Sequence, residues 1–242
     1  MKQLISLSVL ALLLATGGRL FAQEDKAEKL LNNYFIAMGG KEALEAVGSS
    51  RMLMEGVQEV SGIRLKKEEF RLFGQKFHLK LEQGGQRLEQ IFDGQRLSYG
   101  GQVIALEESD KALMRSQTYG FTELMLLEKG YGLSFDGLYA GGDFGKPDYY
   151  RLTATSPDGA TVYTLHYQKD GYKKLTEEMV RTVEVQGGVK RTRITLNFSD
   201  YREVDGVQVP FAIEQKDDSG VIQFKVSEAE LNPSLPSGVF KI

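Results

Sequence analysis

YREVDGVQVPF (residues 201–211) contains the end of one β-strand, a tight turn and the start of a second strand. Asp205 and Gly206 form the turn, because glycine adopts positive φ without steric cost and aspartate tolerates it. After the turn, valine and phenylalanine alternate with glutamine and proline, and alternating side chains point to opposite faces of a strand. The stretch therefore predicts an antiparallel hairpin with one apolar face.

The same alternation recurs in FHLKLE (77–82), TRITLNF (192–198) and VIQFKV (221–226). Such alternation is typical of antiparallel sheets that expose one face to solvent. Five Asp-Gly pairs, which begin at residues 93, 136, 158, 170 and 205, separate strand-like runs. We expect most of these pairs to be hairpin turns in a meander of about ten strands.

Three segments have a helical pattern instead. Apolar residues between 24 and 38 follow the i, i+3, i+4 and i+7 spacing of one helix face, and 41–47 reads as a second, short helix. Residues 107–130 have acidic residues at their start and apolar residues at helical spacing, with Gly120 predicted to divide them into two pieces. These helices are expected to cover the apolar face of the sheet.

The first 22 residues have the pattern of a cleaved secretory signal peptide. Lys2 precedes an apolar run from Leu4 to Ala15, and small residues lead to a predicted cleavage after Ala22. The run is shorter than the roughly 20 residues that a spanning helix needs. Because no Pro/Ser linker or charge block divides the remainder, residues 23–242 are predicted to form a single exported domain.

Composition argues against several classes of function. Without the two basic residues of the signal peptide, 28 basic residues face 33 acidic ones, and this net negative charge disfavours nucleic acid as a partner. The chain has no cysteine. Its two histidines, His78 and His166, lie on the polar sides of strand patterns and are expected to be ordinary surface residues. No hydrolase or zinc-protease motif is present. We therefore predict a protein that is not an enzyme and has no metal or cofactor.

Two interpretations of the apolar sheet face remain open. The face and its helices form either a site for a hydrophobic ligand or a filled core, in which case the partner is another protein. A ligand is physically plausible, because an acyl chain gains about 0.8 kcal/mol for each methylene that leaves water. Periodicity alone does not separate the two interpretations.

Three stretches together carry a resemblance to a known family. They are YREVDGVQVPF, the C-terminal LPSGVFKI (235–242), and YFIAMGGKEALEAV (34–47) before a first strand at Ser49 and Ser50. This combination resembles exported LolA-like proteins, the outer-membrane lipoprotein-sorting superfamily. The resemblance implies an α+β, β-dominated fold: an incomplete, half-open antiparallel β-barrel of about eleven strands, with helices covering the concave face.

The resemblance also implies a function. It suggests a monomeric periplasmic carrier that binds a lipid or lipoprotein acyl chain, with an inner-membrane transporter and an outer-membrane receptor as partners. An envelope sensor or scaffold that binds a protein is the alternative. FRLFGQKF (70–77) is similar to the carrier's strand motif and places its lid-gating arginine at Arg71, although Leu72 stands where the motif has proline.

The lipid is expected between the sheet and the helices at 25–47 and 107–129. The predicted lipid-binding residues are Arg71, Phe77, Leu79, Leu81, Leu124, Met125, Ile194, Leu196 and Phe198. Which apolar face of the sheet is concave does not follow from the pattern.

Overall fold

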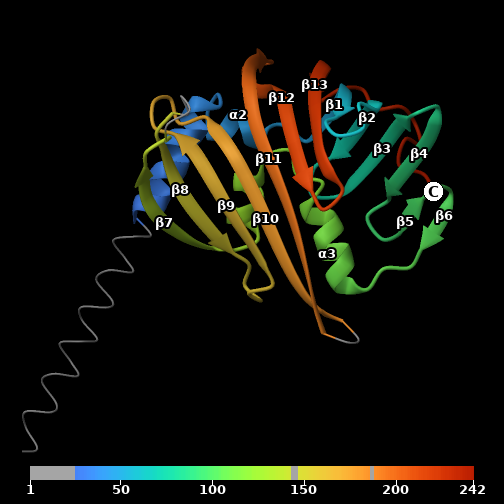
Figure 1. Cartoon of the computed structure of the whole chain (residues 1–242), viewed down its shortest axis with the longest axis horizontal. Coiled ribbons are helices and arrows are strands. Elements are labelled where there is room, and N and C mark those ends of the chain that lie inside the picture. Colours follow the sequence, from blue (N-terminus) through green and yellow to red (C-terminus); the bar gives the residue numbers. More distant parts are fainter. Residues whose placement is uncertain (1–24, 143–146, 186–187) are drawn as a thin grey trace, which may run out of the picture.

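The computed structural model describes residues 25–142, 147–185 and 188–242, so the predicted signal peptide lies outside the described residues. The chain forms one curved sheet of 13 strands, in which every neighbouring pair is antiparallel (Figure 1). The strands are β1 (Ser49–Gln58), β2 (Arg64–Leu72), β3 (Lys76–Gln83), β4 (Gln86–Phe92), β5 (Leu97–Tyr99), β6 (Gln102–Ile104), β7 (Gly132–Tyr139), β8 (Tyr149–Thr155), β9 (Thr161–Gln168), β10 (Lys174–Val185), β11 (Gly188–Val204), β12 (Val207–Asp217) and β13 (Gly220–Leu231).

The sheet consists of two meanders joined in the middle. Strands β1 to β6 form one arm and β7 to β13 the other, and β1 pairs with β13 between them. Because β6 and β7 are the two edges, the sheet is not closed, which confirms the predicted half-open barrel. The structure has 13 strands rather than about eleven. The short β5 and β6, three residues each, leave no room for a period-2 pattern.

Four of the five Asp-Gly pairs lie in turns between consecutive strands, as predicted. The pair at 136 is different, because it lies inside β7, where the pairing with β8 shifts by one residue between Phe135 and Gly137. Gly137 has a φ of 117°, which makes it the glycine of a β-bulge rather than of a turn.

The helices lie where the sequence predicts them. The N-terminal helix covers 25–37 and is followed by α2 (Lys41–Glu45), while α3 (Glu108–Ser116) and α4 (Thr122–Glu128) are separated around Gly120. None of the helices in the described ranges is long and apolar enough to cross a membrane.

The N-terminal helix and α4 pack on the same face of the sheet, which we call the helix-bearing face. Tyr34 of the helix meets Tyr167 of β9 edge to face, with ring centroids 5.2 Å apart. At the end of the helix, the N–H of Gln208 donates to the Met38 carbonyl at 2.9 Å. The hairpin turn at 205–206 is therefore the place where the N-terminal helix docks on the sheet. The buried apolar residues of the helix are Ala27, Leu30, Leu31, Tyr34, Phe35 and Met38.

Candidate functional site

The seven predicted lipid-binding residues that are in strands lie on the helix-bearing face, and the other two, Leu124 and Met125, belong to α4, which packs on it. Cross-strand pairs share a face, and the pairs Arg71–Phe77, Glu69–Leu79 and Glu177–Leu196 each contain one buried residue, namely Phe77, Glu69 and Glu177. The nine residues form two groups, one on β2 and β3 and the other on β11 and α4. The lipid-binding role of these residues remains a prediction.

A second apolar cluster lies between the two groups and was missed by the sequence analysis. Its buried members, Met54, Phe224 and Val226, come from β1 and β13. Further residues pack against it partly buried, namely Met52, Phe211, Ile213, Ile222 and Ala229. We call these eight residues the central apolar stripe. All of them are strand residues, and among the described residues no helical side chain belongs to the stripe.

The alternation in 221–226 was the available signal for this stripe. It shows that Ile222, Phe224 and Val226 share a face, but it does not say which strands lie beside them. That information is in the register of β13 with β1. A Cβ on Gly56 of β1 would lie 2.7 Å from the Phe224 ring, so the glycine leaves space for this ring to lie across β1.

Helices α3 and α4 are held very differently. Helix α4 buries Glu123, Met125 and Leu126 almost completely, whereas α3 buries none of its residues. Only Met114 of α3 packs partly against the apolar cluster around Phe77. Two polar contacts also hold α3: Nη2 of Arg115 donates to the Gly94 carbonyl at 3.1 Å, and Asp110 lies 3.8 Å from Arg181. Helix α3 is thus a cover without a buried side chain, and α4 is a fixed part of the core.

A buried ion network fixes α4. Nζ of Lys174 lies 3.2 Å from Oε1 of Glu123 and 2.7 Å from Oε2 of Glu177, and the Tyr167 hydroxyl donates to Glu123 at 3.0 Å. Although burial disfavours the charge of Lys174, the two carboxylates outweigh this effect and raise the pKa of the amine above its usual value. The network joins α4 to β9 and β10 beneath the N-terminal helix.

Arg71 fixes the segment that joins α3 to α4. Its Nη1 donates to the carbonyl of Tyr119 at 2.9 Å, and its Nε contacts the carboxylate of Glu69. Lys67 approaches the other oxygen of Glu69 at 2.7 Å. A Cβ on Gly120 would overlap the Phe73 ring at 2.1 Å, so this joint also packs closely on the turn between β2 and β3. Arg71 therefore ties the helical segment to the sheet.

Glu69 makes this tie dependent on pH. Burial opposes its charge, but Arg71 and Lys67 outweigh burial and lower its pKa from 4.5 to about 2. An unfolded chain takes up the proton near pH 4.5, and the folded chain only near pH 2. The stabilisation is therefore complete above pH 4.5 and is lost as the pH falls towards 2. We expect Glu69→Gln to remove this part of the pH dependence of the unfolding free energy.

Urea unfolding at a series of pH values below 5 measures this effect. The matched control is Glu55→Gln, which changes an exposed carboxylate on the neighbouring strand. If the unfolding free energy of Glu69→Gln changed with pH as steeply as that of the unmodified protein, Glu69 would not be the source of this pH dependence.

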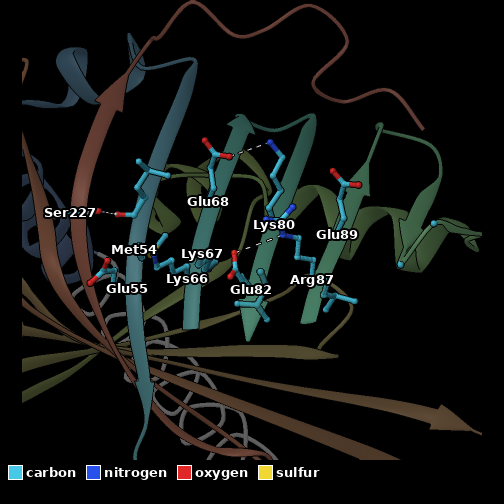
Figure 2. Close-up of a pocket in the computed structure, with 15 residues that line it drawn as sticks. Met54, Glu55, Lys66, Lys67, Glu68, Lys80, Glu82, Arg87, Glu89 and Ser227 are labelled. Atoms are coloured by element: carbon cyan, nitrogen blue, oxygen red, sulfur yellow. Dashed lines mark hydrogen bonds and ion pairs between the residues drawn. The ribbon is translucent and has the colours of Figure 1, made fainter. Parts of the chain in front are cut away.

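The opposite, outer face of β1 to β4 carries a groove of about 870 Å³ (Figure 2). Most of its lining is charged side chains of both signs, with Leu53, Met54, Leu81 and Leu88 among them. Several of the charged side chains are already paired: Lys80 with Glu68 at 3.2 Å, and Arg87 with Glu82 at 3.9 Å. Figure 2 shows these side chains standing on the strands. The groove thus suits a polar partner better than an acyl chain.

His78 borders this charged surface, and its structure corrects the expectation of an ordinary surface residue. It is only 5% exposed, its ring lies near Phe70, and Nε2 donates to the Glu89 carboxylate at 2.6 Å. His166 is partly buried, and burial together with nearby Arg151 lowers its pKa. In the described ranges, no three potential metal-ligating side chains come together.

Comparisons with known proteins agree with this architecture. No protein-family model matches the sequence, and no curated protein does. Among solved structures, a LolA superfamily protein from Nitrosomonas europaea superposes with a TM-score of 0.55 at 14% identity. A DUF1329 family protein from Desulfovibrio piger gives 0.52 at 10% identity. Each match covers 89% of this chain and 97% of the other. The chain therefore has a LolA-like fold.

Proposed function

We propose that the protein binds the acyl chain of a lipid or lipoprotein on the helix-bearing face, beneath α3. One observation carries the proposal: the central apolar stripe contains no helical side chain among the described residues, and α3, which lies inside the curve of the sheet (Figure 1), buries none of its own. A cover of this kind can leave the sheet at small cost. The sheet beneath it would then present apolar side chains to a ligand.

The energetic scale favours an acyl chain as the ligand. A chain of about 16 carbons gains on the order of 12 kcal/mol when it leaves water completely. When α3 leaves the sheet, the apolar contacts that are lost are those of a few partly buried residues such as Met114. Displacement of α3 by the ligand is therefore the movement we propose, while Arg71 and the Lys174 network hold the joint and α4 in place.

The proposed function also places the protein in the periplasm. With a cleaved signal peptide at 1–22, the protein would be a monomeric periplasmic carrier that receives its ligand from an inner-membrane component and delivers it to the outer membrane. The LolA-like fold supports this proposal.

Leu196→Glu tests the placement of the ligand. Leu196 is only partly buried on the helix-bearing face of β11, so a carboxylate there would be desolvated by a bound acyl chain. We expect the variant to retain at least tenfold less lipid than the unmodified protein, since an unpaired charge costs more than 1.4 kcal/mol in an apolar site. The measurement is mass spectrometry of the protein from the periplasm of its own cell type, after organic extraction.

Thr195→Glu is the matched control, because this neighbouring residue points to the outer face of the same strand. It should retain the lipid of the unmodified protein. Equal lipid content in Leu196→Glu and Thr195→Glu would contradict the placement. An unmodified protein that carries no lipid and takes none up from micelles would contradict the proposed function itself.

A protein-binding scaffold is the second candidate, and the polar groove on the outer face favours it. In this case the helix-bearing face would be only a core. The two candidates differ in thermal unfolding, because a ligand that binds only the folded state must raise the midpoint. A carrier should melt at a higher temperature with added fatty acid, and a scaffold with a filled core should not.

A further inference from the structure

Strands β10 and β11 continue beyond their neighbours as a two-stranded ribbon. Pairing of β10 with β9 ends at Arg181, and pairing of β11 with β12 begins at Thr195, but β10 and β11 pair with each other as far as Val185 and Gly188. We call residues 183–185 and 188–193 the ribbon. Figure 1 shows it protruding at one end of the sheet, at the opposite end of β11 from the turn at 205–206.

The ribbon is basic although the chain is acidic. It contains Lys190, Arg191 and Arg193 but only one acidic residue, Glu184, whereas the whole chain has a formal net charge of −3. Arg193 is 3.8 Å from Glu178 and has a side chain that is 55% exposed. Lys190 and Arg191 are exposed and form no ion pair with any residue that the structure describes. These two charges are available to a partner.

The ribbon also presents an apolar side chain to solvent. Val189 is 66% exposed, next to Lys190 and Arg191 in sequence. An exposed apolar residue that is followed by two basic residues suits a membrane surface, where the apolar side chain enters the boundary of the headgroups and the basic side chains attract anionic lipids. The phosphate backbone of a nucleic acid would use the charges but would leave Val189 in water.

We infer that the ribbon docks the protein on anionic lipid membranes. This surface lies roughly 50 Å along β11 from the turn at 205–206, a distance set by the rise of about 3.3 Å per residue. It is also distinct from the helix-bearing face. Docking therefore needs no acyl chain beneath α3, so this inference and the proposed function can fail separately.

Cosedimentation of the protein with vesicles tests the inference. Vesicles that contain phosphatidylglycerol should bind the protein, and vesicles of phosphatidylcholine alone should bind it much less. Each basic residue near an anionic surface contributes about fivefold in binding. We therefore expect Lys190→Gln/Arg191→Gln to weaken binding to anionic vesicles by at least about tenfold, and high salt to do the same by screening. Val189→Asp should weaken it as well.

Lys41→Gln/Arg202→Gln is the matched control. It removes the same charge from exposed positions near the opposite end of β11, where Lys41 pairs with Glu45 and Arg202 with Asp200. This variant should bind vesicles as the unmodified protein does. Equal losses in both double variants would show that binding reports net charge and not the ribbon. Equal binding to neutral and anionic vesicles would also overturn the inference.

Discussion

Lys174→Met is expected to lower the free energy of unfolding by about 3–5 kcal/mol. The amine of Lys174 is the charge that balances Glu123, which is fully buried, and Glu177, which is 9% exposed. Methionine has a similar shape but leaves two carboxylates close together with no cation, and such carboxylates are costly to bury. Because a typical domain is stable by only 5–15 kcal/mol, this loss would be evident in urea unfolding monitored by circular dichroism.

The control for this experiment removes the whole network. In Glu123→Gln/Lys174→Met/Glu177→Gln no charge of this network remains, and glutamine still accepts from the Tyr167 hydroxyl and from Thr122. We expect this triple variant to recover most of the lost stability, since neutral replacements of buried ion pairs are often tolerated. A triple variant as unstable as Lys174→Met would show that methionine at this position fails for reasons of packing and not of charge.

Gly39→Ala is the second substitution with a large expected effect, a loss of about 4 kcal/mol. Gly39 has a φ of 116°, where an alanine is strained. A Cβ there would also lie 2.2 Å from the carbonyl oxygen of Gly206, which belongs to the backbone of the docking turn and cannot rotate away. The variant should separate the end of the N-terminal helix from the β11–β12 turn and lower the thermal midpoint.

Gly40→Ala separates the two causes of the expected loss of stability, which are the backbone strain and the clash with Gly206. Gly40 has a similar φ of 101°, but a Cβ there would meet no atom within 4 Å. This variant should lose only the cost of the backbone strain, about 1–3 kcal/mol. Equal losses in the two variants would mean that the contact with Gly206 contributes nothing.

Much of the fold was predictable because the responsible signals are local. FHLKLE, TRITLNF and VIQFKV show their strand period within six or seven residues, and all three lie in strands. The division of 107–130 at Gly120 was equally visible. Strands β5 and β6 could not be predicted from the alternation of side chains, because three residues do not define a period.

The candidate site was less predictable, because it depends on which strands become neighbours. Lys173 and Lys174 are adjacent and chemically identical, yet Lys173 pairs with Gln208 and Lys174 lies buried between two glutamates. Nothing in the sequence distinguishes them. His78 appeared to be on a solvated face for the same reason, since alternation separates two faces of a strand but does not say what covers each.

The pairing of β1 with β13 has a consequence for how the molecule assembles. Within each arm, neighbouring strands are consecutive along the chain, so these hairpins close over short loops. The seam between the arms is different: Asn232 binds the backbone of Gly48 across 184 residues. Contacts at such separations form slowly. We infer that the two arms fold early, each as a separate meander. The central apolar stripe then forms in the last step, when nearly the whole chain has been made.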